Sequence, residues 1–369
     1  MTVNNESKAS FLQRKLNVPP LFSSAIMEGL AEEALLADDT ELPQPNFTKA
    51  RITEDGSRLP HSIAHRGFKA KFPENTMSSM RGAVEAGAHA LETDIHLTKD
   101  GVVVLSHDAN LKRCFGKPEK IIDCDWEYIQ SLRTIAKPYV PMPRLKELLE
   151  YLATPGLEDI WLLLDIKLDN DAADVIRLIA SDIASVSLAP GTKPWNQRIV
   201  LGFWATKYLG VIFKYLPNYP ISHIGFSTNY ARQFFTVPNV SFNMLQAVLV
   251  GPMGSAFIKE AKQYNRSIFA WTVNEEKRMR WCINEALDGV ITDDPEKFLQ
   301  ISKEYENAIV RQKNRGILRK KERFTIRDWF EIVRTNFFIV LFLVLFKWKF
   351  GWGIENTFIR RQVAPAEKR

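Results

Sequence analysis

The segment LETDIHLTKDGVVVLSHD, residues 91–108, places four carboxylates and two histidines within eighteen residues of otherwise β-prone sequence. Glu92, Asp94 and His96 are spaced by two, so in a β-strand they share one face while the aliphatic residues of the segment point to the other. Such a face can bind a cation or transfer protons. The alternative is a solvated edge hairpin whose polar face meets water.

The dipeptide Asp100-Gly101 is a strong signal for a two-residue hairpin loop. With this dipeptide as the loop, the register of the hairpin places Asp94 opposite His107. Directly opposed residues on one face of an antiparallel pair lie about 5 Å apart. The sequence therefore predicts that a carboxylate and an imidazole well separated along the chain become neighbours.

These residues belong to a longer alternation of strands and helices that begins at residue 61. Apolar runs typical of buried strands alternate with helix-like segments such as LKELLEYL and AADVIRLIA. The predicted core strands are HSIAH from residue 61, ALETDI from residue 90, IWLLLDI at 160–166, RIVLGFW at 198–204, ISHIGF at 221–226, VSFNMLQAVLV at 240–250, SIFAWTV at 267–273 and DGVITD at 288–293. Eight such strands, with residues 101–107 folded back above the sheet, predict an α/β fold of the (β/α)8 TIM-barrel type. An open doubly wound sheet is the alternative, but no G-x-G-x-x-G follows the first strand.

Polar residues gather at or just beyond the carboxyl ends of five of these strands. They are His65-Arg66-Gly67, Glu92 and Asp94, Asp165 and Lys167, Trp271 and Asn274, and Thr292 and Asp293. In a barrel these strand ends converge on the face that carries active sites. The pattern therefore indicates one site rather than five unrelated surface positions.

The composition fits a globular protein with one large domain and appendages, because the 369 residues are 46% hydrophobic and 25% charged. Three cysteines, without metal-ligand spacing, favour a reducing compartment, and the first twenty residues lack the apolar run of a secretory signal. Residues 1–310 carry 34 Lys and Arg against 38 Asp and Glu, whereas residues 311–369 carry 15 against 5. A near-neutral body with a basic tail indicates a localised anionic partner and argues against nucleic acid.

The chain divides into five predicted regions. They are a poorly ordered leader over residues 1–60 with one helix around 24–36, a catalytic barrel over 61–305, a basic amphipathic linker over 306–335, a membrane-inserting segment over 336–354, and a basic tail over 355–369.

The segment FFIVLFLVLF, residues 337–346, contains ten uninterrupted apolar residues and is followed by KWKFGW. Ten residues are too few to cross a bilayer as a helix, which takes about 20. Lysine and tryptophan at the end of the run are typical of an interfacial anchor. A monotopic or hairpin-like insertion is therefore favoured over a full span, with the basic residues upstream facing anionic lipid. A buried barrel helix is the weaker alternative, because the pattern of the barrel is already complete.

The motifs AHRGFKAKFPENT, ALETDIHLTKDGVVVLSHD, LLDIK, AWTVN and GVITDDPE follow one another along the chain. In this order and spacing they resemble the glycerophosphodiester phosphodiesterase (GDPD) family over about residues 61–303. Among its members the chain is most similar to the fungal phosphatidylglycerol-specific phospholipase C type, which carries a hydrophobic C-terminal segment.

The resemblance implies a barrel enzyme with one divalent cation, Mg²⁺ or Ca²⁺, and two catalytic histidines. His65 and His107 would be the acid–base pair, and Glu92 and Asp94 would bind the metal. The third ligand in the family is usually the Glu of an E-x-K pair, where this chain has Asp165. The shorter side chain leaves both direct ligation and a bridging water open.

The resemblance also implies residues that bind the substrate. Arg66 would hold the phosphate, and Lys167 would reach one of its oxygens. Trp271 is either a substrate contact or core packing, and its place at a strand end favours contact. Glu74 and Asn75 match the family motif P-E-N, which shapes the loop after the first strand.

The remaining histidines are interpreted as supporting residues. His61 and His223 are isolated on strands and are expected in the core or on the surface. His96 is expected to lie beside the metal ligands without binding the metal. His89 and the cysteines are expected to be structural.

The chemistry itself requires these residue types. A phosphodiester anion repels nucleophiles, so hard carboxylate ligands must hold a cation against its oxygens. Displacement needs a base for the attacking hydroxyl and an acid for the departing alkoxide, and histidine titrates near neutral pH. In the favoured route, a hydroxyl beside the phosphoester on the glycerol headgroup attacks first and gives a cyclic phosphate, which water then opens.

We therefore expect a membrane-associated, metal-dependent phospholipase C that hydrolyses phosphatidylglycerol to diacylglycerol and glycerol phosphate. The alternatives are a glycerophosphodiester phosphodiesterase or lysophospholipase D on deacylated or lyso substrates, and a catalytically inactive lipid-binding or tethering protein. The expected partners are an anionic glycerophospholipid and a membrane or lipid-droplet surface contacted through residues 336–354. The expected location is cytosol-facing, on the endoplasmic reticulum, the mitochondrial outer surface or lipid droplets.

Overall fold

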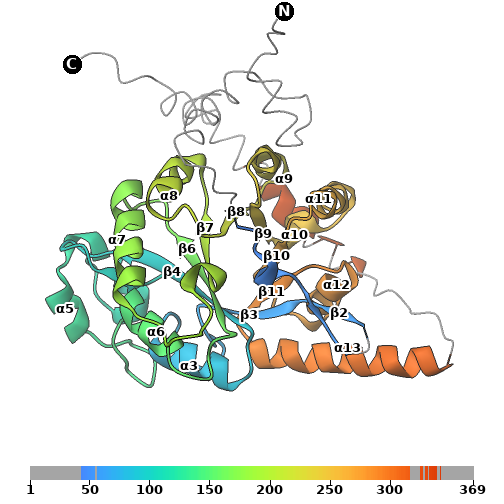
Figure 1. Cartoon of the computed structure of the whole chain (residues 1–369), viewed down its shortest axis with the longest axis horizontal. Coiled ribbons are helices and arrows are strands. Elements are labelled where there is room, and N and C mark those ends of the chain that lie inside the picture. Colours follow the sequence, from blue (N-terminus) through green and yellow to red (C-terminus); the bar gives the residue numbers. More distant parts are fainter. Residues whose placement is uncertain are drawn as a thin grey trace, which may run out of the picture.

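The computed structural model describes residues 43–54, 56–315, 325–326, 329–330, 332–338 and 341. Eight parallel strands close into a barrel in the order β3-β4-β6-β7-β8-β9-β10-β11, and β11 pairs with β3 to complete it (Figure 1). Their bounds are β3 His61–His65, β4 Ala90–Leu97, β6 Trp161–Ile166, β7 Ile199–Phe203, β8 Ile221–Gly225, β9 Ser241–Leu245, β10 Ile268–Trp271 and β11 Gly289–Thr292. The predicted (β/α)8 barrel is confirmed, and each of its eight predicted strands is present.

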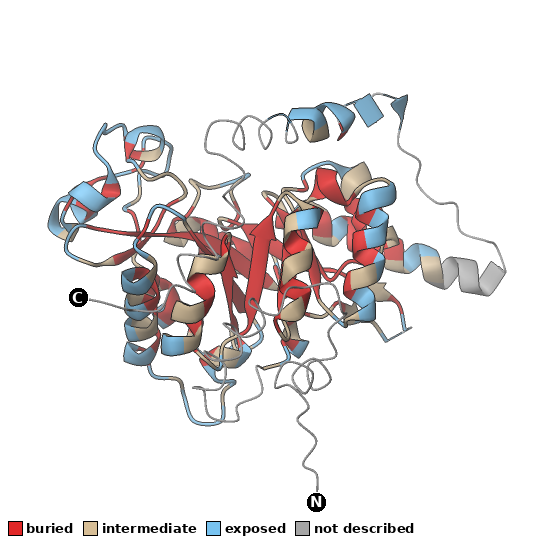
Figure 2. Ribbon diagram, turned by 90° about the horizontal axis from the view of Figure 1, so that it is seen from above, coloured by how far each residue is buried: buried red, intermediate tan, exposed pale blue. Residues whose placement is uncertain are grey.

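The strands are buried on both faces, which explains their continuous apolar runs (Figure 2). Leu162 and Leu164 of β6 face the large core beneath the helices. Leu163 between them belongs to a smaller cluster inside the barrel, together with Ile63 and Phe269. The same alternation in β4 sends Glu92 and Asp94 to the inside of the barrel.

Helices cover the outside of the barrel, with their buried residues toward the strands (Figure 2). The helix α7 (Ala172–Ser185) is an example. Its buried residues, spaced by three or four, are Val175, Ile176, Ile179 and Ile183. Between residues 56 and 315 the other α-helices are α3 Met77–Glu85, α4 Lys112–Phe115, α5 Trp126–Ser131, α6 Leu145–Leu152, α8 Leu209–Tyr215, α9 Thr228–Ala231, α10 Gln246–Leu249, α11 Pro252–Gln263, α12 Glu276–Asn284 and α13 Pro295–Arg315. The 3-10 helices are η1 Asn46–Thr48, η2 Ile121–Asp123, η3 Trp195–Gln197, η4 Thr206–Tyr208 and η5 Arg232–Thr236. The run predicted as a strand over 240–250 is a strand only to Leu245, and its remainder forms α10, which packs against α11.

The hairpin after β4 differs from the prediction by one residue. β5 (Val103–Leu105) pairs with β4 in the register Ile95↔Leu105, and the backbone N–H of Ser106 donates to the carbonyl oxygen of Asp94. Asp94 therefore lies opposite Ser106 and not opposite His107. The reason is a three-residue loop that ends at Gly101, whose φ of 81° suits a loop with one residue more than the predicted two.

Residues 107–144, between β5 and α6, form a lobe beside the barrel rim that we call the insertion lobe (left, with α5, in Figure 1). The lobe has an apolar core of its own, separate from that of the barrel. Its members are Val104 of β5, Leu111, Phe115, Ile121, Cys124, Ile129, Leu132 and Met142. The lobe can therefore hold the loop that begins with His107 in a fixed place.

The last part of the predicted leader is structured. Residues 43–60 form η1 and a small antiparallel sheet of β1 (Arg51–Ile52) and β2 (Arg58–Leu59). The hydroxyl of Thr48 lies 3.0 Å from that of Ser267, and the backbone N–H of Ala50 donates to Asp288. These contacts attach the segment to the amino-terminal ends of the barrel strands. Residues 1–42, including the helix predicted around 24–36, lie outside the described residues.

The C-terminal region was predicted as a linker and a membrane-inserting segment. α13 continues ten residues past the expected boundary at 305, and its far end extends beyond the barrel (Figure 1). Among residues 325–341 that the structure describes, Ile332 is buried and the side-chain amide of Asn336 donates to the carbonyl oxygen of Ala247 at 3.1 Å. Within the described part of the chain, no helix is long and apolar enough to cross a bilayer. Residues 342–354 and the basic tail lie outside it.

Three histidines away from the rim make stability depend on pH: His61 and His223 are buried, and His89 is partly buried. Burial is the main reason why the pKa of His61 is lowered to about 4 and the pKa values of His89 and His223 to about 3. An unfolded histidine has a pKa of about 6.5, so below that pH the unfolded chain binds more protons than the folded one. We expect the free energy of unfolding to fall by about 2 kcal/mol per histidine between pH 8 and pH 5.

Denaturant unfolding at both pH values tests this expectation, with His223→Leu as the matched variant. His223 lies among Phe203, Tyr230 and Phe234, and neither ring nitrogen makes a hydrogen bond of good geometry. The pH-dependent change in the free energy of unfolding should be about a third smaller in the variant, since it removes one of the three imidazoles with a lowered pKa. An unchanged pH dependence in His223→Leu would contradict the expectation.

Candidate active site

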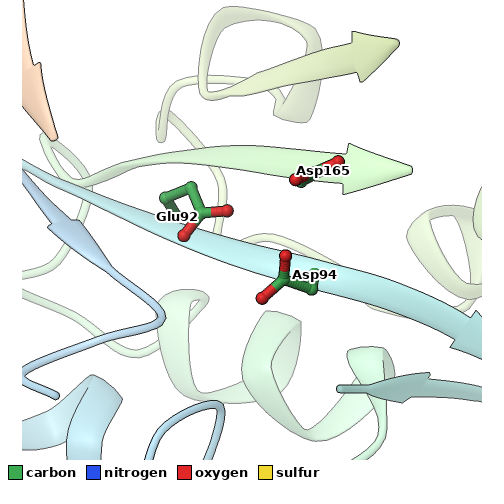
Figure 3. Close-up of side chains that lie close together, drawn as sticks. All are labelled: Glu92, Asp94 and Asp165. Carbon is green, nitrogen blue, oxygen red and sulfur yellow. The ribbon is translucent and has the colours of Figure 1, made fainter. Parts of the chain in front are cut away.

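The carboxylates of Glu92, Asp94 and Asp165 lie together at the carboxyl-end face of the barrel (Figure 3). Glu92 and Asp94 come from β4, and Asp165 pairs with Asp94 across the neighbouring strand β6. One oxygen from each carboxylate lies within 4.8 Å of the others, and all three residues are buried. The structure thus brings the three predicted metal ligands into one cluster, which we call the carboxylate triad.

The electrostatics of the carboxylate triad suit a cation. Burial and then the neighbouring carboxylates raise the pKa of Glu92, and burial also raises the pKa of Asp165. Burial opposes the ionisation of Asp94 as well, but Lys167, Arg66 and the nearby His107 outweigh it and lower the pKa of Asp94. Two permanent cations face three carboxylates, so a hard divalent cation, which prefers carboxylate oxygens, would relieve the remaining repulsion.

Lys167 and Trp204 hold the third carboxylate. The Lys167 ammonium lies 2.6 Å from Asp94 Oδ1 and 2.6 Å from Asp165 Oδ2. The indole Nε1–H of Trp204 donates to Asp165 Oδ1 at 2.7 Å. The predicted phosphate contact Lys167 therefore lies between two of the candidate metal ligands, and both oxygens of Asp165 have a protein donor.

His65, at the end of β3, is held by an aspartate from the end of β11. Its Nδ1 lies 2.6 Å from Asp293 Oδ1, and the other oxygen of Asp293 accepts from Asn274 at 2.9 Å. Burial opposes ionisation of Asp293, but its contact with His65 outweighs it and lowers the pKa of Asp293 to about 2. Because an ionised carboxylate can only accept, Nδ1 carries the hydrogen and Nε2 is left for a substrate.

His107, the first residue of the insertion lobe, is held in the same way by its neighbour in the sequence. Its Nδ1 lies 2.8 Å from Asp108 Oδ1. Burial lowers the pKa of His107, although Asp94 acts against it, and this favours the neutral imidazole that a general base requires. His96 does not reach the triad as a ligand, since its Nε2 lies 3.3 Å from the carbonyl oxygen of His107.

The turn after β3 explains the His-Arg-Gly motif. Arg66 and Gly67 both have positive φ, 58° and 76°. A Cβ on Gly67 would lie 2.4 Å from the hydroxyl oxygen of Ser79, so the turn requires glycine. The turn directs the backbone N–H of Arg66 to Glu92 Oε2 at 2.8 Å, which ties the motif to the carboxylate triad.

The Pro-Glu-Asn motif holds catalytic groups as well as shaping its loop. Glu74 accepts a hydrogen bond from Nη1 of Arg66 at 2.8 Å, and Nε of Arg66 lies 3.2 Å from Asp94 Oδ2 without hydrogen-bond geometry. The amide of Asn75 donates to the same oxygen of Asp94 at 2.8 Å and accepts from the hydroxyl of Thr93. The motif therefore positions both Arg66 and Asp94.

Trp271 lies at the rim within a wall of aromatic rings. Its Nε1–H donates to the carbonyl oxygen of Asn243 at 3.0 Å, and its ring packs edge-to-face on Trp204 with 5.7 Å between centroids. Trp204 continues the wall to Phe226, at 6.4 Å. Trp271 is partly exposed, as a substrate contact would be.

Four residues position the site although the sequence analysis assigned no partner to any of them, and it placed only Asp293 at the rim. They are Asp108, Arg113, Trp204 and Asp293. Asp108 and Asp293 stand within the quoted motifs, so their partnership with the two histidines could have been sought there. Trp204 gave a weaker signal, its place at the end of a predicted strand.

Comparison with known proteins gives the same assignment as the geometry. The profile of the glycerophosphoryl diester phosphodiesterase family matches residues 65–297. The chain is 25% identical to a glycerophosphodiester phosphodiesterase of Caldanaerobacter subterraneus subsp. tengcongensis over 250 residues, which are 65% of this chain and 96% of the relative. It is 29% identical to human lysophospholipase D GDPD3 over 276 residues, which are 63% of this chain and 81% of the relative.

Two solved structures share the fold. A glycerophosphodiester phosphodiesterase from Parabacteroides distasonis has a TM-score of 0.56 at 21% identity, covering 67% of this chain and 99% of its own. An Oleispira antarctica phosphodiesterase, solved with the product sn-glycerol-3-phosphate, has a TM-score of 0.57 at 19% identity, covering 66% of this chain and 97% of its own.

The matched region begins at His65 and contains the carboxylate triad, both histidines and Asp293. Members of the matched family are phosphoric diester hydrolases that use a divalent metal ion, and the triad could hold one. The chain belongs to the glycerophosphoryl diester phosphodiesterase family and is a phosphoric diester hydrolase.

Proposed function

We propose that this enzyme hydrolyses a glycerophospholipid at a membrane surface, and that its preferred reaction is the cleavage of phosphatidylglycerol to diacylglycerol and glycerol phosphate. The observation that supports the chemistry is the arrangement of two histidines, each held at Nδ1 by an aspartate, beside a buried carboxylate triad. A divalent cation on the triad would polarise the phosphate oxygens. Arg66, beside Asp94, would pair with the phosphate charge.

His65 and His107 supply the two proton transfers. One of them removes the proton from a hydroxyl next to the phosphoester, whose oxygen then forms a bond to phosphorus. The bond between phosphorus and the leaving oxygen breaks, and the other histidine protonates that oxygen. The product is a cyclic phosphate. Water then forms a new bond to phosphorus and breaks one ring bond with the histidine roles reversed, which restores both to their starting protonation states.

This route decides which ester bond breaks. The alcohol that carries the neighbouring hydroxyl keeps the phosphate, and the other alcohol leaves. In phosphatidylglycerol the hydroxyl is on the headgroup, so diacylglycerol leaves. In a lysophospholipid the hydroxyl is on the glycerol backbone, so the headgroup alcohol leaves. The second reaction is of the lysophospholipase D type, the activity named for the human relative, and it is the alternative function of the same site.

An exposed apolar surface supports access from a lipid surface. Its members, within the described part of residues 325–341, are Ile326, Trp329, Phe330, Val333, Phe337, Phe338 and Leu341. Five of them recur every three or four residues, as on one face of a helix. The segment is attached through Asn336 to Ala247, just beyond the carboxyl end of β9, so this surface lies on the side of the barrel that carries the triad. An apolar helix face preceded by basic sequence is typical of binding to anionic membranes.

The location is a further proposal. We propose a cytosol-facing surface, such as the endoplasmic reticulum, the mitochondrial outer surface or lipid droplets, with residues 336–354 as the contact. Most of that segment lies outside the described residues.

The test is product analysis with the purified full chain and Mg²⁺ or Ca²⁺, with and without a chelator. The substrates are phosphatidylglycerol vesicles, vesicles of phosphatidyl-1,3-propanediol, lysophosphatidylcholine, and glycerophosphocholine in solution. The propanediol lipid is the matched control because its headgroup lacks only the neighbouring hydroxyl. We expect metal-dependent release of diacylglycerol from phosphatidylglycerol and none from the propanediol lipid.

Each other result has a defined meaning. Equal cleavage of the propanediol lipid would contradict the cyclic route, because its headgroup lacks the hydroxyl next to the phosphoester that would attack. Turnover confined to lysophosphatidylcholine and glycerophosphocholine would select the alternative function. Cleavage of phosphatidylglycerol in detergent but not in vesicles would contradict the proposed action at a membrane surface.

A further inference from the structure

Arg113, on α4 of the insertion lobe, connects two carboxylates that belong to different parts of the site. Its Nε donates to Asp108 Oδ2 at 2.7 Å, and its two terminal nitrogens donate to the two oxygens of Glu74 at 2.8 and 2.7 Å. The Glu74 side chain is only 8% exposed, whereas that of Arg113 is 48% exposed. A planar guanidinium is the side chain suited to three such bonds at fixed angles.

Each of these carboxylates has a second partner among the residues assigned to the reaction. Asp108 holds Nδ1 of His107 at 2.8 Å. Glu74 accepts from Arg66 at 2.8 Å. A continuous chain of charge-assisted hydrogen bonds therefore runs from the imidazole of His107, through Arg113, to the guanidinium of Arg66.

The two carboxylates of this chain are ionised, and each lies between two hydrogen-bond donors. Burial opposes the ionisation of Glu74 and Asp108, but hydrogen bonds from Arg113 outweigh it, so the pKa of Glu74 is lowered and that of Asp108 falls to about 2. Both carboxylates are therefore ionised at neutral pH. Glu74 lies between the guanidinium groups of Arg66 and Arg113, and Asp108 lies between Arg113 and Nδ1–H of the His107 imidazole. Removal of Arg113 would leave an anion at each of two positions beside the site.

We propose that Arg113 is a positioning residue that sets the separation and orientation of His107 and Arg66, and that through it the insertion lobe serves the reaction. The inference rests on the roles proposed above for those two residues. Leu111 and Phe115, on either side of Arg113, are buried in the core of the insertion lobe and so fix its backbone. Without the guanidinium of Arg113, Asp108 can turn away from His107. Among the residues that the structure describes, Glu74 then has Arg66 as its one remaining cationic partner, so Arg66 can shift toward it.

The experiment measures kcat and KM for Arg113→Ala, Arg113→Lys and Lys112→Ala in the full chain, on whichever of phosphatidylglycerol vesicles and glycerophosphocholine the wild type turns over faster. Lys112→Ala is the matched control, because it removes an exposed cation one residue away. We expect Arg113→Ala to lose about 10- to 100-fold in kcat, as is usual when a group that orients a catalytic side chain is removed. The kcat of Arg113→Lys should lie between those of the wild type and Arg113→Ala, because an ammonium keeps the charge but cannot bridge both carboxylates in one plane.

Added guanidinium chloride at millimolar concentration supplies the decisive readout. It should restore part of the kcat of Arg113→Ala, since the exposed side of the site admits the free ion. A variant that has merely lost stability cannot be rescued in this way, because guanidinium is a denaturant. In a His107→Ala background, Arg113→Ala should add little further loss in kcat, since the two residues act as a unit.

Wild-type kcat in Arg113→Ala, or a loss that guanidinium leaves unchanged, would overturn the inference. If Arg113→Ala does not fold, Arg113→Lys carries the test, and wild-type kcat in that variant would overturn it. His107→Ala measured in parallel separates the two levels of the argument. Full turnover in His107→Ala would contradict the proposed function. If His107→Ala loses turnover and Arg113→Ala keeps the wild-type kcat, only the role of Arg113 is contradicted.

Discussion

Replacing His65 or His107 by alanine is expected to lower kcat for phosphodiester hydrolysis by about 10²- to 10⁴-fold, the range for losing a positioned acid or base. Each imidazole is held at Nδ1 by an ionised aspartate, so Nε2 is the atom that each presents to the substrate. Both side chains lie at the rim, and His107 is 37% exposed, so the variants should keep the barrel fold. The loss should therefore appear in the chemical step with the fold intact.

A substrate with a good leaving group assigns the two roles. In an ester of glycerol phosphate with p-nitrophenol, the leaving oxygen needs no proton, whereas the attacking hydroxyl still needs a base. The alanine variant that recovers activity on this ester, relative to an alkyl ester, has lost the general acid. The variant that stays slow on both has lost the base of the first step.

His223→Leu is the control for the histidine variants, because it removes an imidazole that is buried away from the site. It should keep wild-type kcat on both esters. Near-wild-type turnover in His65→Ala or His107→Ala on the alkyl ester would remove that histidine from the mechanism.

The barrel and the place of its site could be predicted because their signals are local. A strand buried on both faces must be apolar along its whole length, so each barrel strand stood out as an apolar run. If the strands are parallel, the polar residues at their carboxyl ends must all lie on the same rim of the barrel. This reasoning placed Glu92, Asp94 and Asp165 on one rim, and they form one cluster.

The register of the hairpin and the hydrogen-bond partners of the catalytic histidines were harder to predict. They depend on one backbone angle or on residues far apart in the sequence. A two-residue loop at Asp100-Gly101 and the observed three-residue loop use the same glycine, yet they move the opposed residue from His107 to Ser106. Asp293 lies 228 residues from the histidine that it holds, and no local pattern connects them. The structured residues 43–60 likewise owe their order to contacts with the distant Ser267 and Asp288.

Glu92→Gln is expected to abolish metal-dependent turnover while stabilising the metal-free protein. Charge stabilisation by a bound metal is worth several kcal/mol, so the loss in kcat should be about 100-fold or more. The opposite effect on stability follows from the raised pKa of Glu92, which burial and the neighbouring carboxylates cause. A carboxyl whose folded pKa lies above its unfolded value loses stability as pH rises through the folded pKa. The neutral amide does not titrate, so its advantage over the wild type should grow with pH.

Thermal unfolding at pH 7 with and without Mg²⁺ or Ca²⁺, beside turnover, measures both effects. The wild type should gain Tm on addition of the metal, because a ligand that binds the folded state stabilises it, whereas Glu92→Gln should start from a higher Tm and gain little. Glu127→Gln, which neutralises an exposed glutamate of the insertion lobe, should behave as the wild type in both assays.

Metal-dependent turnover that survives in Glu92→Gln would place the metal elsewhere. Oε2 of Glu92 also accepts a hydrogen bond from the backbone N–H of Arg66. If Glu92→Gln is less stable than the metal-free wild type, this hydrogen bond stabilises the fold by more than the repulsion from Asp94 and Asp165 destabilises it.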